Sequence, residues 1–429
     1  MIHGISFLPS GKVMFFNKWI EGKGYLKEKV AGQKLYEGVL VNNGVEMISG
    51  IIKNILFNDA LETQGTKDTT NTALVAHAGK VLALMEAQKP VLMHLEVGDD
   101  TVEFSTEKVN YDFDGDLVGN LTAHPKLDPR TGEMIGFSYD MAKKPHMRYT
   151  EVDSRGDVSY SIGLYDVPRG VMSHDMAITK THAILLDLPL VFDAANFLKN
   201  EFPVQFEKNA GARLGLLERG GRGSLVQWFD IKNQANVFHT VNAFNCPETG
   251  EVVLHAMRAE PEKDGYVFND YSPSYLHEWR LNPETNSVKE RRLGELAGEF
   301  PCINPNYVGE KAEFAYTVVD GFMGRLKQWT YPPIGIVYNS LAKYDLGSGS
   351  VVDKWDCDQG LYIYEPEFVP KVDSKSEDEG FLVLFCTDAI KDKSYFCILD
   401  AQNLRNGPLS LIEVPQKIPS GLHGQFIPL

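Results

Sequence analysis

Short β-prone runs, each closed by a turn, recur along almost the whole chain and constrain its fold more than any other feature. Six of these runs are MIGFSYD (134–140), DVSYSIGLYDV (157–167), HAILLDLPLVF (182–192), EVVLHAMRA (251–259), YLHEWRL (275–281) and GFLVLFCTD (380–388). Three similar turns are DPRTGE (128–133), CPETGE (246–251) and NPETN (282–286), whose Gly or Asn suits a position that needs a permissive backbone. Loosely repeated hairpins favour an all-β fold, and a β-propeller over a jelly roll. Since no convincing linker interrupts the pattern, we predict one domain over residues 1–429.

The charge and cysteine content make several classes of protein improbable. The chain has 42 basic and 58 acidic residues, a net charge of −16, and no basic stripe interleaved with aromatics, so we do not expect nucleic acid as a partner. No stretch approaches the roughly 20 consecutive apolar residues of a membrane-spanning helix. Five scattered cysteines without a CxxC pair predict free thiols rather than a disulfide framework or a zinc cage.

Four histidines lie in short, distinctive peptides: His124 in LTAHPKLDP, His174 in VMSHDMAIT, His239 in FHTVNAFN and His423 in GLHGQFI. Successive positions are 50, 65 and 184 residues apart, so no local metal motif such as HExxH joins them. The chain has 11 histidines, and any one of them is more often a surface or hydrogen-bonded structural residue than a ligand. Four neutral imidazoles at one point would suit iron, copper or zinc. Only a fold that brings distant segments to a common axis can produce such a site.

All four peptides resemble, in the same order, the metal-binding segments of the carotenoid cleavage oxygenase family, which includes stilbene-cleaving oxygenases and retinoid isomerases. The matching elements are TAHPK-x-DP-x-TGE, SHD-x-AIT, FH-x-x-NAF and G-x-HG. The resemblance implies a seven-bladed propeller with apolar helices over the face where substrate enters. It also implies Fe(II) on the four histidines, and O2-dependent cleavage of a conjugated C=C bond of a carotenoid or apocarotenoid to two carbonyl products. The alternatives are a stilbene-cleaving dioxygenase of the same family and a non-catalytic propeller that acts as a binding module.

Three glutamates match the carboxylates that orient the histidine ligands in this family. They are Glu86 in VLALMEAQKP, Glu299 in GEFPCIN and Glu365 in YEPEFVP. The resemblance implies that they bond all the histidines except His124, but it leaves open which glutamate serves which histidine. A single carboxylate is most often a solvated surface charge, whereas these apolar peptides favour buried partners. Thr72, 14 residues before Glu86, matches the family position whose methyl group shields one side of the iron.

Three further residues bear on the substrate. Phe238, directly before the third histidine, is a candidate aromatic wall, and ordinary core packing is an equal alternative. Leu422 stands where the family usually has Phe, which alters the expected pocket. Met85 occupies the position at which stilbene cleavers carry a phenol-activating Lys. Because a thioether cannot donate a hydrogen bond to a phenolate, Met85 disfavours a hydroxystilbene substrate. The LALMEAQKP and TAHPK-x-DP peptides resemble those of the plant-type carotenoid or apocarotenoid dioxygenases.

One segment departs from the β pattern. In GVEMISGIIKNILFNDAL (44–61) the apolar residues have helical spacing, so the segment predicts either a helix packed on the propeller or an interfacial helix that contacts a membrane. Family members usually have a sizeable segment before the run that begins this chain at Met1, so we expect the N-terminal part of the family domain, and any targeting peptide, to be missing. The expected location is the cytoplasm or a plastid-like compartment, at the membrane periphery.

Overall fold

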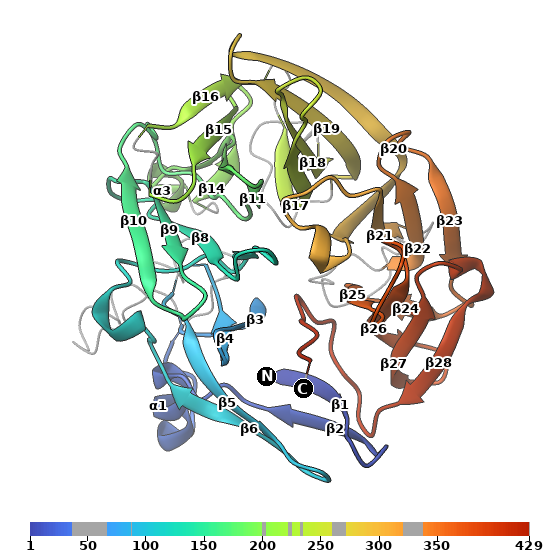
Figure 1. Ribbon diagram of the computed structural model, residues 1–429. Coiled ribbons are helices and arrows are strands. Elements are labelled where there is room, and N and C mark those ends of the chain that lie inside the picture. The colour runs from blue at the N-terminus through green and yellow to red at the C-terminus, as the bar shows by residue number, and fades with distance from the viewer. Residues whose placement is uncertain are drawn as a thin grey trace.

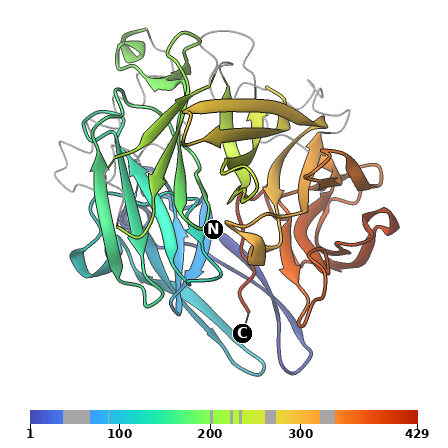
Figure 2. The ribbon, with the colours of Figure 1, turned by 45° about the horizontal axis from the view of Figure 1, so that its top comes forward.

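The fold is a ring of antiparallel sheets. The computed structural model describes residues 1–36, 67–86, 88–199, 203–221, 225–231, 235–259, 272–320 and 338–428. Figure 1 shows sheets that follow one another around a common centre in chain order, from blue to red. In the tilted view of Figure 2, the C-terminal segment lies inside this ring. The predicted all-β class is therefore confirmed.

The described part of the first half of the ring contains two hairpins and three four-stranded sheets. The first hairpin pairs β1 (Ile2–Phe7) with β2 (Val13–Lys18), and helix α1 (Lys23–Ala31) follows. The first sheet contains β3 (Ala73–His77), β4 (Lys80–Leu84), β5 (Val91–Val97) and β6 (Val102–Lys108), and the second contains β7 (Lys126–Leu127), β8 (Met134–Tyr139), β9 (Met147–Val152) and β10 (Val158–Leu164). The third contains β11 (Ala177–Ile178), β12 (His182–Asp187), β15 (Arg213–Glu218) and β16 (Gln227–Asp230). Between β12 and β15 lie the hairpin of β13 (Leu190–Phe192) with β14 (Val204–Phe206) and helix α3 (Ala195–Leu198).

The second half is one continuous hydrogen-bonded set of twelve strands. They are β17 (Asn236–Asn245), β18 (Val252–Ala259), β19 (Ser274–Asn282), β20 (Ser287–Cys302), β21 (Phe314–Asp320), β22 (Tyr338–Asp345), β23 (Val351–Asp356), β24 (Leu361–Ile363), β25 (Glu367–Pro370), β26 (Gly380–Asp388), β27 (Lys393–Asp400) and β28 (Pro408–Glu413). Short 3-10 helices lie at Phe113–Gly115, Pro305–Tyr307 and Leu404–Asn406. Strand β20 spans 16 residues, and pairs first with β19 and then with β21. It therefore joins two neighbouring sheets.

The three similar turns close hairpins, as their sequences predict. They connect β7 to β8, β17 to β18 and β19 to β20. The left-handed position is Gly132 at φ 71°, Gly250 at φ 67° and Asn286 at φ 50°, where Gly and Asn are least strained. The Gly132 N–H donates to the Asp128 carbonyl at 2.8 Å, and the Gly250 N–H donates to the Cys246 carbonyl at 2.9 Å. These local patterns thus mark real hairpin positions.

Five of the six predicted runs coincide with single strands, namely β8, β10, β18, β19 and β26. The sixth, residues 182–192, forms two strands that break around Pro189, where the chain has no N–H to donate to a ladder. Every residue of β18 is buried. Leu254 and Trp279 pack with Leu186 and Phe229 in one cluster, so the core of this region lies between adjacent sheets.

Two predictions about the N-terminal region are not resolved by the fold. Residues 44–61 lie outside the described part of the chain. Among the described helices, none has the length and apolar content to cross a membrane. The hairpin β1–β2 has two strands, whereas the next sheet has four. An incomplete ring at this point stays a prediction.

Candidate metal centre

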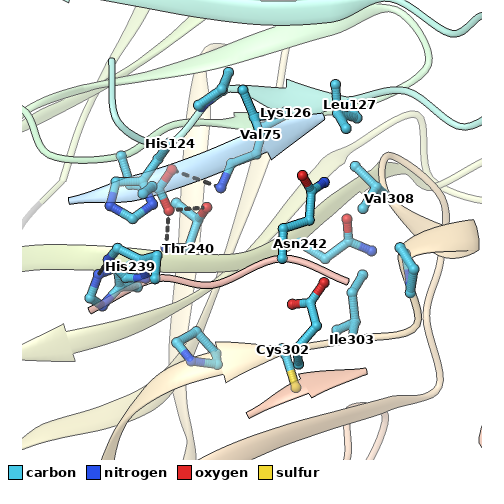
Figure 3. Close-up of a pocket in the computed structure, with 18 of the residues that line it drawn as sticks. Val75, His124, Lys126, Leu127, His239, Thr240, Asn242, Cys302, Ile303 and Val308 are labelled. Atoms are coloured by element: carbon cyan, nitrogen blue, oxygen red, sulfur yellow. Dashed lines mark hydrogen bonds and ion pairs between the residues drawn. The ribbon is translucent and has the colours of Figure 1, made fainter. Parts of the chain in front are cut away.

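Four imidazoles meet inside the ring. His124, His174, His239 and His423 each offer a ring nitrogen, and these four atoms lie within 4.8 Å of one another. The Nε2 atoms of His124 and His174 are 3.0 Å apart, and those of His239 and His423 are 3.3 Å apart. Figure 3 shows His124 and His239 at one end of a pocket. The fold therefore brings all four predicted histidines together.

Irregular backbone delivers these side chains. His124 and His174 lie just before the short strands β7 and β11, and His423 lies in the C-terminal segment, where its N–H donates to the Thr72 carbonyl at 3.1 Å. His239 lies within β17 at a shift of register between Val237 and Thr240. A bulge of this kind re-aims a side chain that regular pleating would direct elsewhere. The site is thus built at strand starts and bulges.

Each of three histidines contacts one glutamate, of which Glu86 and Glu299 are buried and Glu365 is partly exposed. His239 Nδ1 is 2.5 Å from Glu299 Oε2, and His423 Nδ1 is 2.7 Å from Glu365 Oε1. His174 Nδ1 makes a close contact with Glu86 Oε1. The described contacts of the remaining ring, His124, are with the other histidines and its own chain segment. The structure therefore assigns the pairs that the sequence left open.

The glutamate contacts determine which nitrogen of each imidazole is protonated, and the nitrogens that remain are suited to a metal ion. An ionised carboxylate only accepts hydrogen bonds, so Glu299 and Glu365 require a proton on Nδ1 of His239 and His423. The Nε2 atom of each neutral ring then carries a lone pair, and the two lone pairs face each other across 3.3 Å. These lone pairs repel each other unless a proton or a metal cation lies among the nitrogens. Imidazole nitrogens suit iron, copper or zinc, so the donor set fits a transition metal.

Burial and the carboxylates set the protonation states. Burial, together with the three neighbouring rings, holds the pKa of His124 well below its usual value. Burial also lowers the pKa of His423, although Glu365 opposes it. Burial would raise the pKa of Glu365, but His423 outweighs it and lowers that pKa. At His239, burial is outweighed by Glu299, and the pKa is raised. Neutral His124 and His423 beside an ionised Glu365 are in the form that metal binding requires.

A cavity of about 460 Å³ opens on one side of the histidines. Three of the ligands line it, together with residues that follow them in the chain, such as Lys126, Thr240 and Gln425. Glu367 also lines it, and burial and the charge of Glu365 raise the pKa of Glu367 to about 8. The lining is mixed, because polar residues such as Asn242 stand among apolar ones such as Val75 and Ile303.

The other predicted residues lie around the site but outside the lining of this cavity. The Thr72 carbonyl contacts the main chain of His423. The Phe238 ring meets the His174 ring edge-on, with centroids 5.5 Å apart. Met85 is buried, and Leu422 is half exposed. Shielding of a metal by Thr72, and substrate contacts by the other three, stay predictions.

Two residues beside the site were not predicted. The Phe300 ring lies 5.1 Å from the ring of His239 and 5.5 Å from that of His423, and its φ of 49° is unusual for a bulky residue. The Tyr139 hydroxyl donates to Glu86 Oε2 at 2.6 Å. Phe300 could have been suspected because it follows Glu299. Tyr139 is 53 residues from its partner, and the sequence gave no indication of the contact.

Fold and site together define the class, an all-β protein with four converging histidines that could hold a metal ion, three of them contacted by carboxylates. The family model described as retinal pigment epithelial membrane protein matches residues 1–428. The chain is 32% identical over 452 residues to carotenoid 9,10(9',10')-cleavage dioxygenase 1 of Arabidopsis thaliana, covering 100% of this chain and 79% of the relative. It is 28% identical to isoeugenol monooxygenase of Pseudomonas nitroreducens, covering 97% and 84%. The chain belongs to this family, that of the carotenoid cleavage oxygenases, and is an oxygenase; the resemblance is confirmed.

Solved structures show the same fold. Lignostilbene dioxygenase of Pseudomonas brassicacearum aligns with a TM-score of 0.78 at 24% identity, covering 96% of this chain and 84% of the other. A variant of the Synechocystis apocarotenoid oxygenase aligns with a TM-score of 0.79 at 22% identity, covering 98% and 85%. At this level of identity the alignments support the fold, and the substrate has to be argued from the site.

Proposed function

We propose that the protein is a non-haem Fe(II) dioxygenase that cleaves a conjugated C=C bond of a carotenoid or apocarotenoid with O2 and gives two carbonyl products. The observation that carries the proposal is the set of four imidazoles, three of them contacted by carboxylates. Fe(II), when bound, would supply the electrons that activate O2. The histidines would hold it, and Glu86, Glu299 and Glu365 would fix the orientation and tautomer of their partners.

The proposed fold is a seven-bladed propeller formed by one domain over residues 1–429. The ring of sheets in Figure 1 and the similarity to solved oxygenase structures support this proposal. In this fold the distant histidines converge because the inner strands of successive sheets face a common axis.

The substrate would approach the metal centre past Phe238 and Leu422. Phe238 and Leu422 directly precede ligands, and neither residue lines the cavity. Phe238 also packs near an apolar cluster of Leu190, Val204 and Phe206, a surface that suits a polyene. We propose Phe238, Met85 and Leu422 as substrate contacts and Thr72 as the shield of one metal position.

A stilbene or phenylpropene substrate is the second candidate. The similarity to isoeugenol monooxygenase over 97% of the chain favours considering it. Met85, which is buried beside Glu86, opposes it, because this side chain cannot donate a hydrogen bond to a phenolate. Contact with a membrane through residues 44–61, in the cytoplasm or a plastid-like compartment, would suit the proposed carotenoid or apocarotenoid substrate.

Two measurements test the proposal. Anaerobic reconstitution followed by metal analysis should give one iron per folded chain, and less than about a tenth of an equivalent would favour the non-catalytic binding module. The reconstituted protein should then bleach carotenoids or apocarotenoids only when O2 is present, with two carbonyl products by mass spectrometry. Cleavage of a hydroxystilbene or isoeugenol, with no carotenoid turnover, would instead establish the second candidate.

A further inference from the structure

One buried carboxylate connects three of the four segments that carry the histidines. Asp175 directly follows His174 and is 1% exposed. Its Oδ1 lies 2.7 Å from the Lys126 ammonium, and its Oδ2 accepts the Thr240 N–H at 2.8 Å. The Thr240 hydroxyl lies 2.8 Å from the same oxygen. The dashed lines beside Lys126 and Thr240 in Figure 3 mark these contacts.

The partners of Asp175 are adjacent to ligands along the chain. Lys126 lies two residues after His124, and Thr240 lies one residue after His239. Asp175 therefore links the start of β7, the approach to β11 and the bulge in β17. Among the described strands, β7, β11 and β17 belong to three different sheets, so ladder hydrogen bonds do not join them.

The contacts of Asp175 are strong enough to fix the relative positions of the three segments. Hydrogen bonds to a charged group contribute more than neutral ones, and a water-excluded site strengthens them further. The carboxylate is almost completely buried, and the Lys126 side chain is 22% exposed. Displacement of any one segment would leave part of a buried charge without its partner, which is costly. The three segments are thus coupled through one group.

We propose that Asp175 is a positioning residue that holds His124, His174 and His239 in the arrangement a metal requires. The inference rests on the proposed metal centre. Asp175 does not touch the reacting atoms. It acts through the backbone of its own segment and through Lys126 and Thr240.

The test is Asp175→Asn, with Asp187→Asn as a matched control. The Asn amide cannot replace both carboxylate contacts. When its oxygen accepts from Thr240, its NH2 group faces the Lys126 ammonium, and two donors then oppose each other. Asp187 is equally buried and pairs with Arg213 at 2.6 Å, and its other described ion-pair partner is Arg169. Neither arginine belongs to the metal centre.

Cobalt(II) titration of each apoprotein, with a competing chelator, supplies affinities, and the d–d absorption spectrum reports the ligand geometry. We expect Asp175→Asn to lower cobalt affinity roughly 10- to 100-fold and to change the spectrum. The cobalt affinity of Asp187→Asn should stay within about twofold of the wild-type value, because distant sites usually act independently. An unchanged affinity and spectrum in folded Asp175→Asn would overturn the inference.

Two further arms keep the outcomes distinct. Should Asp175→Asn not fold, Thr240→Val removes at constant shape the hydroxyl that lies 2.8 Å from both Asp175 Oδ2 and the Met176 carbonyl. A decrease in cobalt affinity is again expected. Wild-type affinity in Thr240→Val would then overturn the inference. Absence of stoichiometric cobalt or iron in the wild-type protein would instead refute the proposed metal centre itself.

Discussion

Tyr139 and Tyr149 form a matched pair that separates support of a metal ligand from simple stability. Tyr139 is 7% exposed and donates to Glu86 Oε2 at 2.6 Å. Tyr149, on the neighbouring strand β9, is fully buried and donates to Glu151 Oε1 at 2.7 Å. Of these two glutamates, only Glu86 also contacts a candidate metal ligand, His174. The perturbation is Tyr→Phe at each position, which removes one hydroxyl and preserves the ring.

The stability changes should be similar in size. A hydrogen bond to a charged group contributes about 1.5–3 kcal/mol, so each variant should lose about that much free energy of unfolding. Glu151 Oε1 still accepts the Gly220 N–H at 2.9 Å in Tyr149→Phe, which places that loss at the lower end. In Tyr139→Phe, Glu86 loses its hydroxyl donor and can rotate away from His174. We expect metal affinity to fall roughly tenfold, equivalent to about 1.4 kcal/mol.

Urea denaturation of the apoproteins gives the stability changes, and cobalt or iron titration with a competing chelator gives the affinities. Tyr149→Phe should bind metal as the wild type does. If Tyr139→Phe lost stability but bound metal as tightly as Tyr149→Phe, Glu86 would not depend on its second donor. The reasoning would also fail if both variants lost metal to the same extent.

Three other changes test separate parts of the structure. His239→Ala should abolish both iron retention and O2-dependent bleaching, because it removes one ligand and the partner of Glu299; retained bleaching would exclude the four-histidine centre. Burial would raise the pKa of Asp128, but Arg130 and Arg219 outweigh it and lower that pKa to about 2. The stabilisation by ionised Asp128 is therefore present above about pH 4 and lost toward pH 2. In Asp128→Asn, the free energy of unfolding measured in urea should change less with pH between these values. Leu254→Ala, at a fully buried core position, should cost about 2–5 kcal/mol in urea while iron per folded chain stays constant.

The sequence predicted the local elements of the fold well because they are encoded locally. A short continuous apolar run marks a strand such as β26, in which every second residue is buried. Gly132, Gly250 and Asn286 mark turns because their backbones must be left-handed. The division of residues 182–192 into two strands was missed, although Pro189 is a local reason for it. Where the determinant lies within a few residues, the sequence is sufficient.

The candidate site was predicted less completely. The four histidines and three glutamates are recognisable from their peptides, and the structure brings the histidines within 4.8 Å of one another. The pairing of Glu299 with His239 spans 60 residues, and that of Glu365 with His423 spans 58. Nothing in either peptide specifies its partner. Tyr139 was missed for the same reason, whereas Phe300 could have been suspected from its position after Glu299.

The sequence by itself determined the strands, the turns and the chemical types available to a metal centre. Hydrogen-bond periodicity and backbone sterics act over a few residues, and side-chain type does not depend on the fold. Only the tertiary structure decided which carboxylate contacts each histidine, and that Asp175 joins the segments of three ligands. These contacts depend on how successive sheets are placed around one centre. That placement is set by packing between sheets across the whole chain, and a short peptide does not contain it.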